Sequence, residues 1–161
     1  QGTLAGALAA GLTLTAGTND VLALTIDGVA ASVTLASTAP YASAAALAAE
    51  VQSKINGATA FSSAGISVSV TAAAGILTIA SNRYGSASSV AIAAGAAHDN
   101  LLGASAALAS AAAFDVAGSI NGAIATGSGQ FLTGAIANAA EGLKVQITGG
   151  ATGARHCAMP R

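Results

Sequence analysis

Alternating apolar and polar positions predict two β-hairpins in the first half of the chain. Residues 21–26 and 29–35 are rich in Val, Leu and Ile and flank Asp27-Gly28, a dipeptide that accepts the positive φ angles of a two-residue hairpin turn. Apolar residues alternate with Ser and Thr over 66–71, and another apolar run follows the loop 72–75 over 76–80. Residues 89–93 predict one further strand. The apolar side of these hairpins requires a covering layer.

The hydrophobic period changes between the two hairpins, where residues 41–56 predict the longest helix. Its apolar positions recur every four residues, Glu50 and Lys54 form an i,i+4 pair, and Gly57 follows as a stop signal. The recurring apolar residues are Leu47, Val51 and Ile55. Residues 22–93 therefore predict a β-β-α-β-β-β unit of α+β class, in which one main helix packs across the face of a sheet.

Beyond residue 94 the pattern predicts a smaller β-hairpin region. Residues 99–103 predict a helical turn closed by Gly103, and the Ala/Ser-rich stretch 104–113 is compatible with either a helix or a linker. A third hairpin is expected over 116–126 with its turn at Asn121-Gly122. Alternating residues predict a last strand over 143–148.

These elements predict four segments. Residues 1–17 form an N-terminal edge strand or linker, 18–103 the β-β-α-β-β-β domain, 104–154 a second β-rich segment and 155–161 an atypical tail. We expect the domain boundary between Gly103 and Phe114. The tail contains the only Cys and the only Met of the chain, so we expect it to be disordered or artefactual, and Gln1 to be the edge of a fragment.

The composition excludes several classes of function. Hydrophobic residues make up 53% of the chain, but many are Ala, and charged residues make up only 7% with a net charge of -1. Five scattered Lys and Arg residues cannot neutralise the row of phosphates that a nucleic acid presents, so we expect no nucleic-acid partner. The uncharged stretches are interrupted by Gly, Ser, Thr and Asn, so we expect no membrane span. With Cys157 alone, an internal disulfide is excluded.

The chemically active side chains predict no catalytic site. His98 precedes Asp99, but no nucleophile on a strained turn accompanies them, so we interpret His98 as a surface or helix-start residue. His156-Cys157 has no further ligand at metal-site spacing. The Gly-rich residues 127–130 lack the Lys-Ser/Thr of a phosphate loop and indicate a hairpin or loop instead. The carboxylates are Asp20, Asp27, Glu50, Asp99, Asp115 and Glu141, with Asp27 assigned to a turn and Glu50 to a solvated helix face.

We therefore assign no catalytic, cofactor-binding or metal-binding residue, and we expect no cofactor and no enzyme. The outward positions of the strands carry Ser, Thr, Asn, Gln and Gly. Such neutral, hydrogen-bonding surfaces suit either contacts with other proteins or contacts with glycans, although plain solvated sheet faces have the same composition.

Several blocks of sequence resemble flagellar proteins. One set resembles the hook IN motif of flagellins and flagellar hook-associated proteins, a unit also similar to some phage tail proteins. It comprises Ile26-Asp27-Gly28, residues 32–37, Tyr41-Ala42-Ser43, residues 47–57 and 66–70, and Leu77-Thr78-Ile79. Residues 81–90, 115–122, 125–130 and 140–150 extend the resemblance to the hook-associated protein 2 family of filament caps, over about residues 21–155.

This resemblance implies a structural, secreted role at the distal tip of the bacterial flagellum. Members of the family form a ring that guides exported flagellin into place, and some contribute to adhesion. Their partners are flagellin and other copies of the cap, with host mucin or glycans as a further class. The long helical ends of the family are missing here, so the chain resembles the head domains only, and we expect this fragment to be monomeric.

The sequence is compatible with two other functions. The chain is also compatible with the outer domain of a flagellin, which shares the hook IN unit, and with a glycan-binding adhesin module. An enzyme is a third alternative that the missing acid, base and nucleophile argue against.

Overall fold

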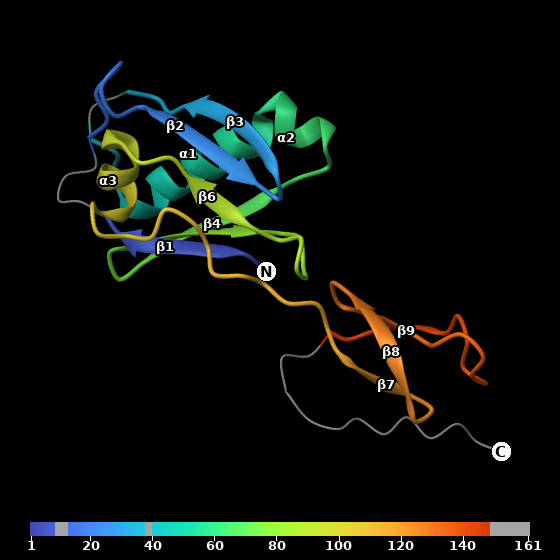
Figure 1. The fold of residues 1–161 in the computed structure, drawn as a ribbon. Coiled ribbons are helices and arrows are strands. Elements are labelled where there is room, and N and C mark those ends of the chain that lie inside the picture. Colours follow the sequence, from blue (N-terminus) through green and yellow to red (C-terminus); the bar gives the residue numbers. More distant parts are fainter. Residues whose placement is uncertain (9–12, 38–39, 149–161) are drawn as a thin grey trace. The chain divides into compact units, whose positions relative to one another are not determined.

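The computed structural model describes residues 1–8, 13–37 and 40–148, and it divides the chain into two compact units. The first unit is Gln1–Asp115 and the second begins at Val116. Helices and antiparallel sheets occur together (Figure 1), so the α+β class is confirmed. The first unit contains β1 (Thr3–Ala7), β2 (Val21–Ile26), β3 (Val29–Thr34), α1 (Ala44–Gly57), α2 (Thr59–Ser63), β4 (Val68–Ala73), β5 (Ile76–Ser81), β6 (Val90–Ile92) and α3 (Ala96–Leu102).

The two hairpins of the first unit form where the sequence predicts them. β2 and β3 are joined by Asp27 and Gly28, whose φ angles of 50° and 86° give the positive-φ turn expected of Asp-Gly. β4 and β5 turn at Ala74 and Gly75, with φ angles of 50° and 77°. Both turns therefore have left-handed backbone at their two central residues.

The six strands of the first unit form two sheets, so the expectation of one sheet is wrong. β3-β2-β6 make one sheet, because β6 returns to pair with β2 instead of β5. β1-β5-β4 make the other, because β1 occupies the remaining side of β5. A single helix with only a few buried residues would cover one sheet incompletely, whereas two sheets bury each other's apolar sides.

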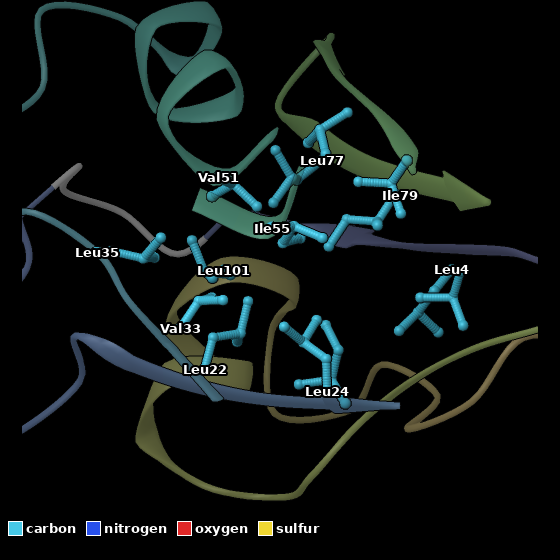
Figure 2. Packing of buried hydrophobic residues seen from close by; sticks show 14 of the residues in the cluster. Leu4, Leu22, Leu24, Val33, Leu35, Val51, Ile55, Leu77, Ile79 and Leu101 are labelled. Carbon is cyan, nitrogen blue, oxygen red and sulfur yellow. The ribbon is translucent and has the colours of Figure 1, made fainter. Parts of the chain in front are cut away.

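The core lies between these sheets. Leu22 and Leu24 from β2 point toward Leu77 and Ile79 from β5, with Val51 and Ile55 of α1 beside them (Figure 2). α1 packs along β4, and α3 contacts β1, β2 and β5. The buried cluster also includes Phe61, which is the largest fully buried side chain and comes from α2.

The main helix α1 begins at Ala44, three residues later than the sequence predicts. Its side chains also cover the outer edge of β4. The Ser43 hydroxyl caps α1 by accepting the Ala46 N–H at 3.1 Å. The Asn56 amide accepts the Val68 N–H at 2.8 Å and donates to the Val68 carbonyl at 3.0 Å. Gln52 accepts the Val70 N–H at 2.8 Å. These side chains occupy the hydrogen-bonding groups along the outer edge of β4.

The second unit is a four-stranded sheet with few buried side chains. Its strand order is β10-β9-β8-β7, and the hairpin predicted at Asn121-Gly122 is present with φ angles of 52° and 77°. Among its described residues the buried hydrophobics are Ala125, Leu132 and Ala140. The strands are β7 (Gly118–Ile120), β8 (Ala123–Ser128), β9 (Phe131–Thr133) and β10 (Lys144–Gln146).

The division between the units lies after Asp115, just beyond the predicted interval of 103–114. Residues 104–115 belong with the first unit, because Ala109 bridges Ala91 and residues 108–110 hydrogen-bond along β6. The predicted N-terminal strand is likewise part of this unit, where β1 lies at the edge of its sheet. The segment 155–161 lies outside the described residues.

The close contact between Gly6 of β1 and the end of α3 can be tested by mutation. A Cβ at Gly6 would collide with the backbone of Leu102 at the end of α3. We therefore expect Gly6→Ala to lower the free energy of unfolding of the first unit by about 1–3 kcal/mol, measured by denaturant unfolding. Gly57→Ala is the control, because a Cβ there meets open space and gains up to about 1 kcal/mol of helix propensity. Equal stabilities for the two variants would contradict the packing of α3 on β1.

Candidate functional site

The His98-Asp99 pair does not form a catalytic arrangement. His98 lies in α3 and is only 2% exposed, so its interpretation as a surface residue is wrong, although its place near the helix start is as expected. Its Nδ1 lies 3.0 Å from the Asp99 carboxylate and its Nε2 lies 3.4 Å from the Ala107 carbonyl. Both ring nitrogens thus face oxygen acceptors that belong to the fold, and the ring fixes the segment after α3 to that helix.

The sequence contains no pattern that predicts the burial of His98. The side chain is enclosed because the segment after α3 passes it at Ala107 before residues 108–110 run beside β6. An Ala/Ser-rich stretch gives no periodicity from which that return could be inferred.

Both carboxylate oxygens of Asp27 accept hydrogen bonds from other parts of the fold. Oδ2 accepts the Ser81 hydroxyl at 2.8 Å and Oδ1 accepts the Ser89 N–H at 2.9 Å. The fully buried Ser81 hydroxyl accepts the Arg83 N–H at 3.0 Å. Asp27 therefore joins the β2-β3 turn to the end of β5 and to the residue before β6, a role beyond the turn that the sequence predicted.

The remaining carboxylates are also dispersed among structural contacts. Glu50 lies 3.8 Å from Lys54 and accepts the Ala36 N–H at 3.2 Å. Asp115 accepts the Ser86 hydroxyl at 2.6 Å. Within residues 1–8, 13–37 and 40–148, no group of three His, Cys, Asp or Glu residues could hold a metal ion.

Tyr41 closes the loop that leads from β3 to α1. Its hydroxyl donates to the Ala36 carbonyl at 2.7 Å. Burial raises the pKa of Tyr41 above its ordinary value of 10.0, and the negative charge of Glu50 raises it further. Because this hydroxyl donates a hydrogen bond inside the fold, it acts as a structural group.

The outer face of the β3-β2-β6 sheet holds a hollow. It is a shallow hollow of about 520 Å³ with a floor of small side chains. Leu108 and Ala109 border it on the β6 side. The floor comes from Ala23, Thr25, Ala30, Ser32, Ala91 and Ala93. Such a surface can make van der Waals contacts and hydroxyl hydrogen bonds, and none of its lining residues is Asp, Glu, His, Cys, Lys or Arg.

In the second unit, one face of the sheet combines hydroxyls with an aromatic ring. Thr126, Thr133 and Lys144 are neighbours across the strands, and Phe131 pairs with Ser128 and Gln146. The Lys144 ammonium lies 4.4 Å from the centre of the Phe131 ring. The residues 127–130 form the end of β8 and its turn, as expected for a hairpin loop.

The chain matches no known family, no curated protein and no solved structure. None of the helices that the structure describes has the length and apolar character needed to cross a membrane.

A structural role for His98 predicts a loss of stability upon its replacement. We expect His98→Ala to lower the free energy of unfolding by about 2–4 kcal/mol, because it leaves a cavity in the buried face of α3. Asp99→Ala is the control and should cost less than about 1 kcal/mol, since Asp99 is 52% exposed and water can replace it. Thermal and denaturant unfolding measure both effects. Comparable small losses for both variants would show that the ring does not anchor this segment.

Proposed function

We propose that the chain forms head domains of a flagellar filament cap, a secreted structural protein at the distal tip of the filament. It acts by contact with flagellin and with other copies of the cap, and it performs no catalysis. The observation that carries this proposal is the outer face of the β3-β2-β6 sheet. Its small and uncharged side chains form a surface suited to contact with another protein. The flagellar filament is proposed as the assembly because the sequence resembles the cap family.

The residues that carry the resemblance have structural positions consistent with the proposal. The first blocks fall on β2, β3, α1, β4 and β5, so they make up both hairpins and the main helix. Residues 81–90 connect β5 to β6 and contact Asp27 and Asp115. The resemblance therefore involves the polar contacts that fasten the connections as well as the apolar core.

A glycan-binding role is a second candidate, favoured by the Phe131 face of the second unit. Aromatic rings stack on the apolar faces of sugars while hydroxyls and amides bind their oxygens. Phe131, Ser128, Thr133 and Gln146 offer these groups on neighbouring strands. This candidate is compatible with adhesion by a cap and with an independent adhesin.

Labelling of intact filaments separates these functions. Antibodies raised against the chain are applied to the bacterium that encodes it, and gold particles are located by electron microscopy. A cap predicts label only at the distal tip, because the cap is present in a few copies there. Label along the whole filament would instead assign the chain to a flagellin, and absence from filaments would overturn a flagellar role.

A glycan array tests the second candidate with the same protein. Binding that Phe131→Ala abolishes and Ile124→Ala retains would support the sugar-binding face, since Ile124 is exposed on the same sheet but distant from the ring in register. An array without binding would exclude this candidate for the sugars it displays.

A further inference from the structure

The tetrapeptide Ile-Asn-Gly-Ala occurs twice in the chain, as residues 55–58 and as residues 120–123. In an Asn-Gly pair the glycine nitrogen can attack the carbonyl carbon of the preceding side-chain amide, because glycine has no Cβ to hinder the approach. The nitrogen of the side-chain amide is then lost as ammonia. Since the two copies have the same local sequence, the fold decides whether Asn56 or Asn121 can react.

The first copy is held at the groups that the reaction needs. Asn56 Oδ1 accepts the Val68 N–H at 2.8 Å, and Asn56 Nδ2 donates to the Val68 carbonyl at 3.0 Å. Gly57 is the last residue of α1, and backbone N–H groups in a helix bind carbonyls of the preceding turn. Attack at Asn56 therefore requires that the end of α1 unwind and that both bonds to β4 break.

The second copy is held much less. Asn121 and Gly122 form the turn between β7 and β8, and both residues are exposed. Asn121 Nδ2 donates to Asn138 Oδ1 at 3.2 Å. Within the part of the chain that the structure describes, neither Asn121 Oδ1 nor the Gly122 N–H has a hydrogen-bond partner. The amide and the attacking nitrogen thus lie together at the surface, and one exposed hydrogen bond restrains them.

The hairpin around this second copy opens at low cost. Ring closure requires the peptide between Asn121 and Gly122 to rotate out of the turn, whose φ angles are 52° and 77°. β7 is three residues long, lies at an edge of its sheet and has no buried residue. A short edge strand frays more readily than a helix packed on a core. The turn therefore reaches the reactive geometry more often than the end of α1 does.

We propose that Asn121 is a site of spontaneous covalent modification, at which the side-chain amide becomes an acid through a cyclic imide. The Gly122 nitrogen forms a bond to Asn121 Cγ, the bond from Cγ to Nδ2 breaks, and ammonia leaves with the proton of the Gly122 N–H. Solvent water, the one co-reactant, then adds to either carbonyl of the imide. One opening leaves aspartate at position 121, and the other leaves isoaspartate, whose main chain includes the side-chain methylene.

The two products have different effects on the turn. Aspartate preserves it, because Asp27-Gly28 adopts the same kind of turn in this chain with φ angles of 50° and 86°. Isoaspartate lengthens the loop by one methylene, so the turn no longer fits the register that pairs Ile120 with Ala123. Both products remove the amide donor to Asn138 and add one negative charge to a chain of net charge -1. The modification is independent of the proposed function, since it follows from the turn alone.

Timed incubation of the full chain in mildly basic buffer, followed by peptide mass spectrometry, tests the site. In the folded chain we expect Asn121 to be converted at least about tenfold faster than Asn56, because less structure must open. In urea the two rates should become equal, since the tetrapeptides are identical. Equal rates in the folded chain would overturn the proposal. So would an unmodified Asn121 after a period that converts both residues in urea.

The restraint and the products are tested separately. Asn138→Ala removes the hydrogen bond to the Asn121 amide and should accelerate conversion at Asn121 while leaving the rate at Asn56 unchanged. Asn121→Asp is the control for charge, and its β7 and β8 amides should exchange hydrogen as slowly as those of the starting chain. The isoaspartate fraction, separated by ion exchange, should lose protection in β7. Equal protection in that fraction and in Asn121→Asp would overturn the assigned effect on the turn.

Discussion

Burial of a small set of large apolar side chains between two sheets is the constraint on which the structure depends. The chain is 53% hydrophobic, but an Ala side chain buries little area, and burial stabilises by about 25 cal/mol per Å² of apolar surface. Among the described residues, the Leu, Ile, Val and Phe side chains that are buried all lie in the first unit except Leu132, and both sheets and the helices of that unit share them. The fold has two sheets in this unit because neither sheet alone can cover its own apolar side.

Local chemistry made some features of the fold predictable. Asp27-Gly28 and Asn121-Gly122 adopt positive φ, and that preference belongs to the dipeptides themselves. The period of Leu47, Val51 and Ile55 likewise predicts α1 without reference to the rest of the chain. The pairing of β1 with β5 and of β6 with β2 was not predictable, because it depends on contacts between segments far apart in sequence. The prediction that His98 lies at the surface is wrong for the same reason, because residues 104–110, which come later in the chain, enclose its side chain.

The polar residues are used mainly within the fold. Asp27 binds Ser81 and Ser89, and Asn56 binds both backbone groups of Val68. These hydrogen bonds hold polar side chains within the fold, and the outer face of the β3-β2-β6 sheet carries mainly Ala, Ser and Thr. The scarcity of charged side chains is evident from the composition, whereas the position of the small-residue face depends on the strand register.

The second unit has a different basis for its stability. Its sheet is held mainly by strand pairing, since its described residues bury only Ala125, Leu132 and Ala140 among the hydrophobics. Sheets with so small a core are marginal in water. The apolar core of Gln1–Asp115 therefore holds most of the stability of the chain.

Native-state hydrogen exchange measures how the stability is divided between the two units. We expect the slowest amides to lie in β2, β5 and α1 and to open only with global unfolding, while the amides of β7 to β10 exchange through opening of the second unit at much lower free energy. Equal protection of the two units, or slower exchange in β8 and β9 than in β2 and β5, would contradict it.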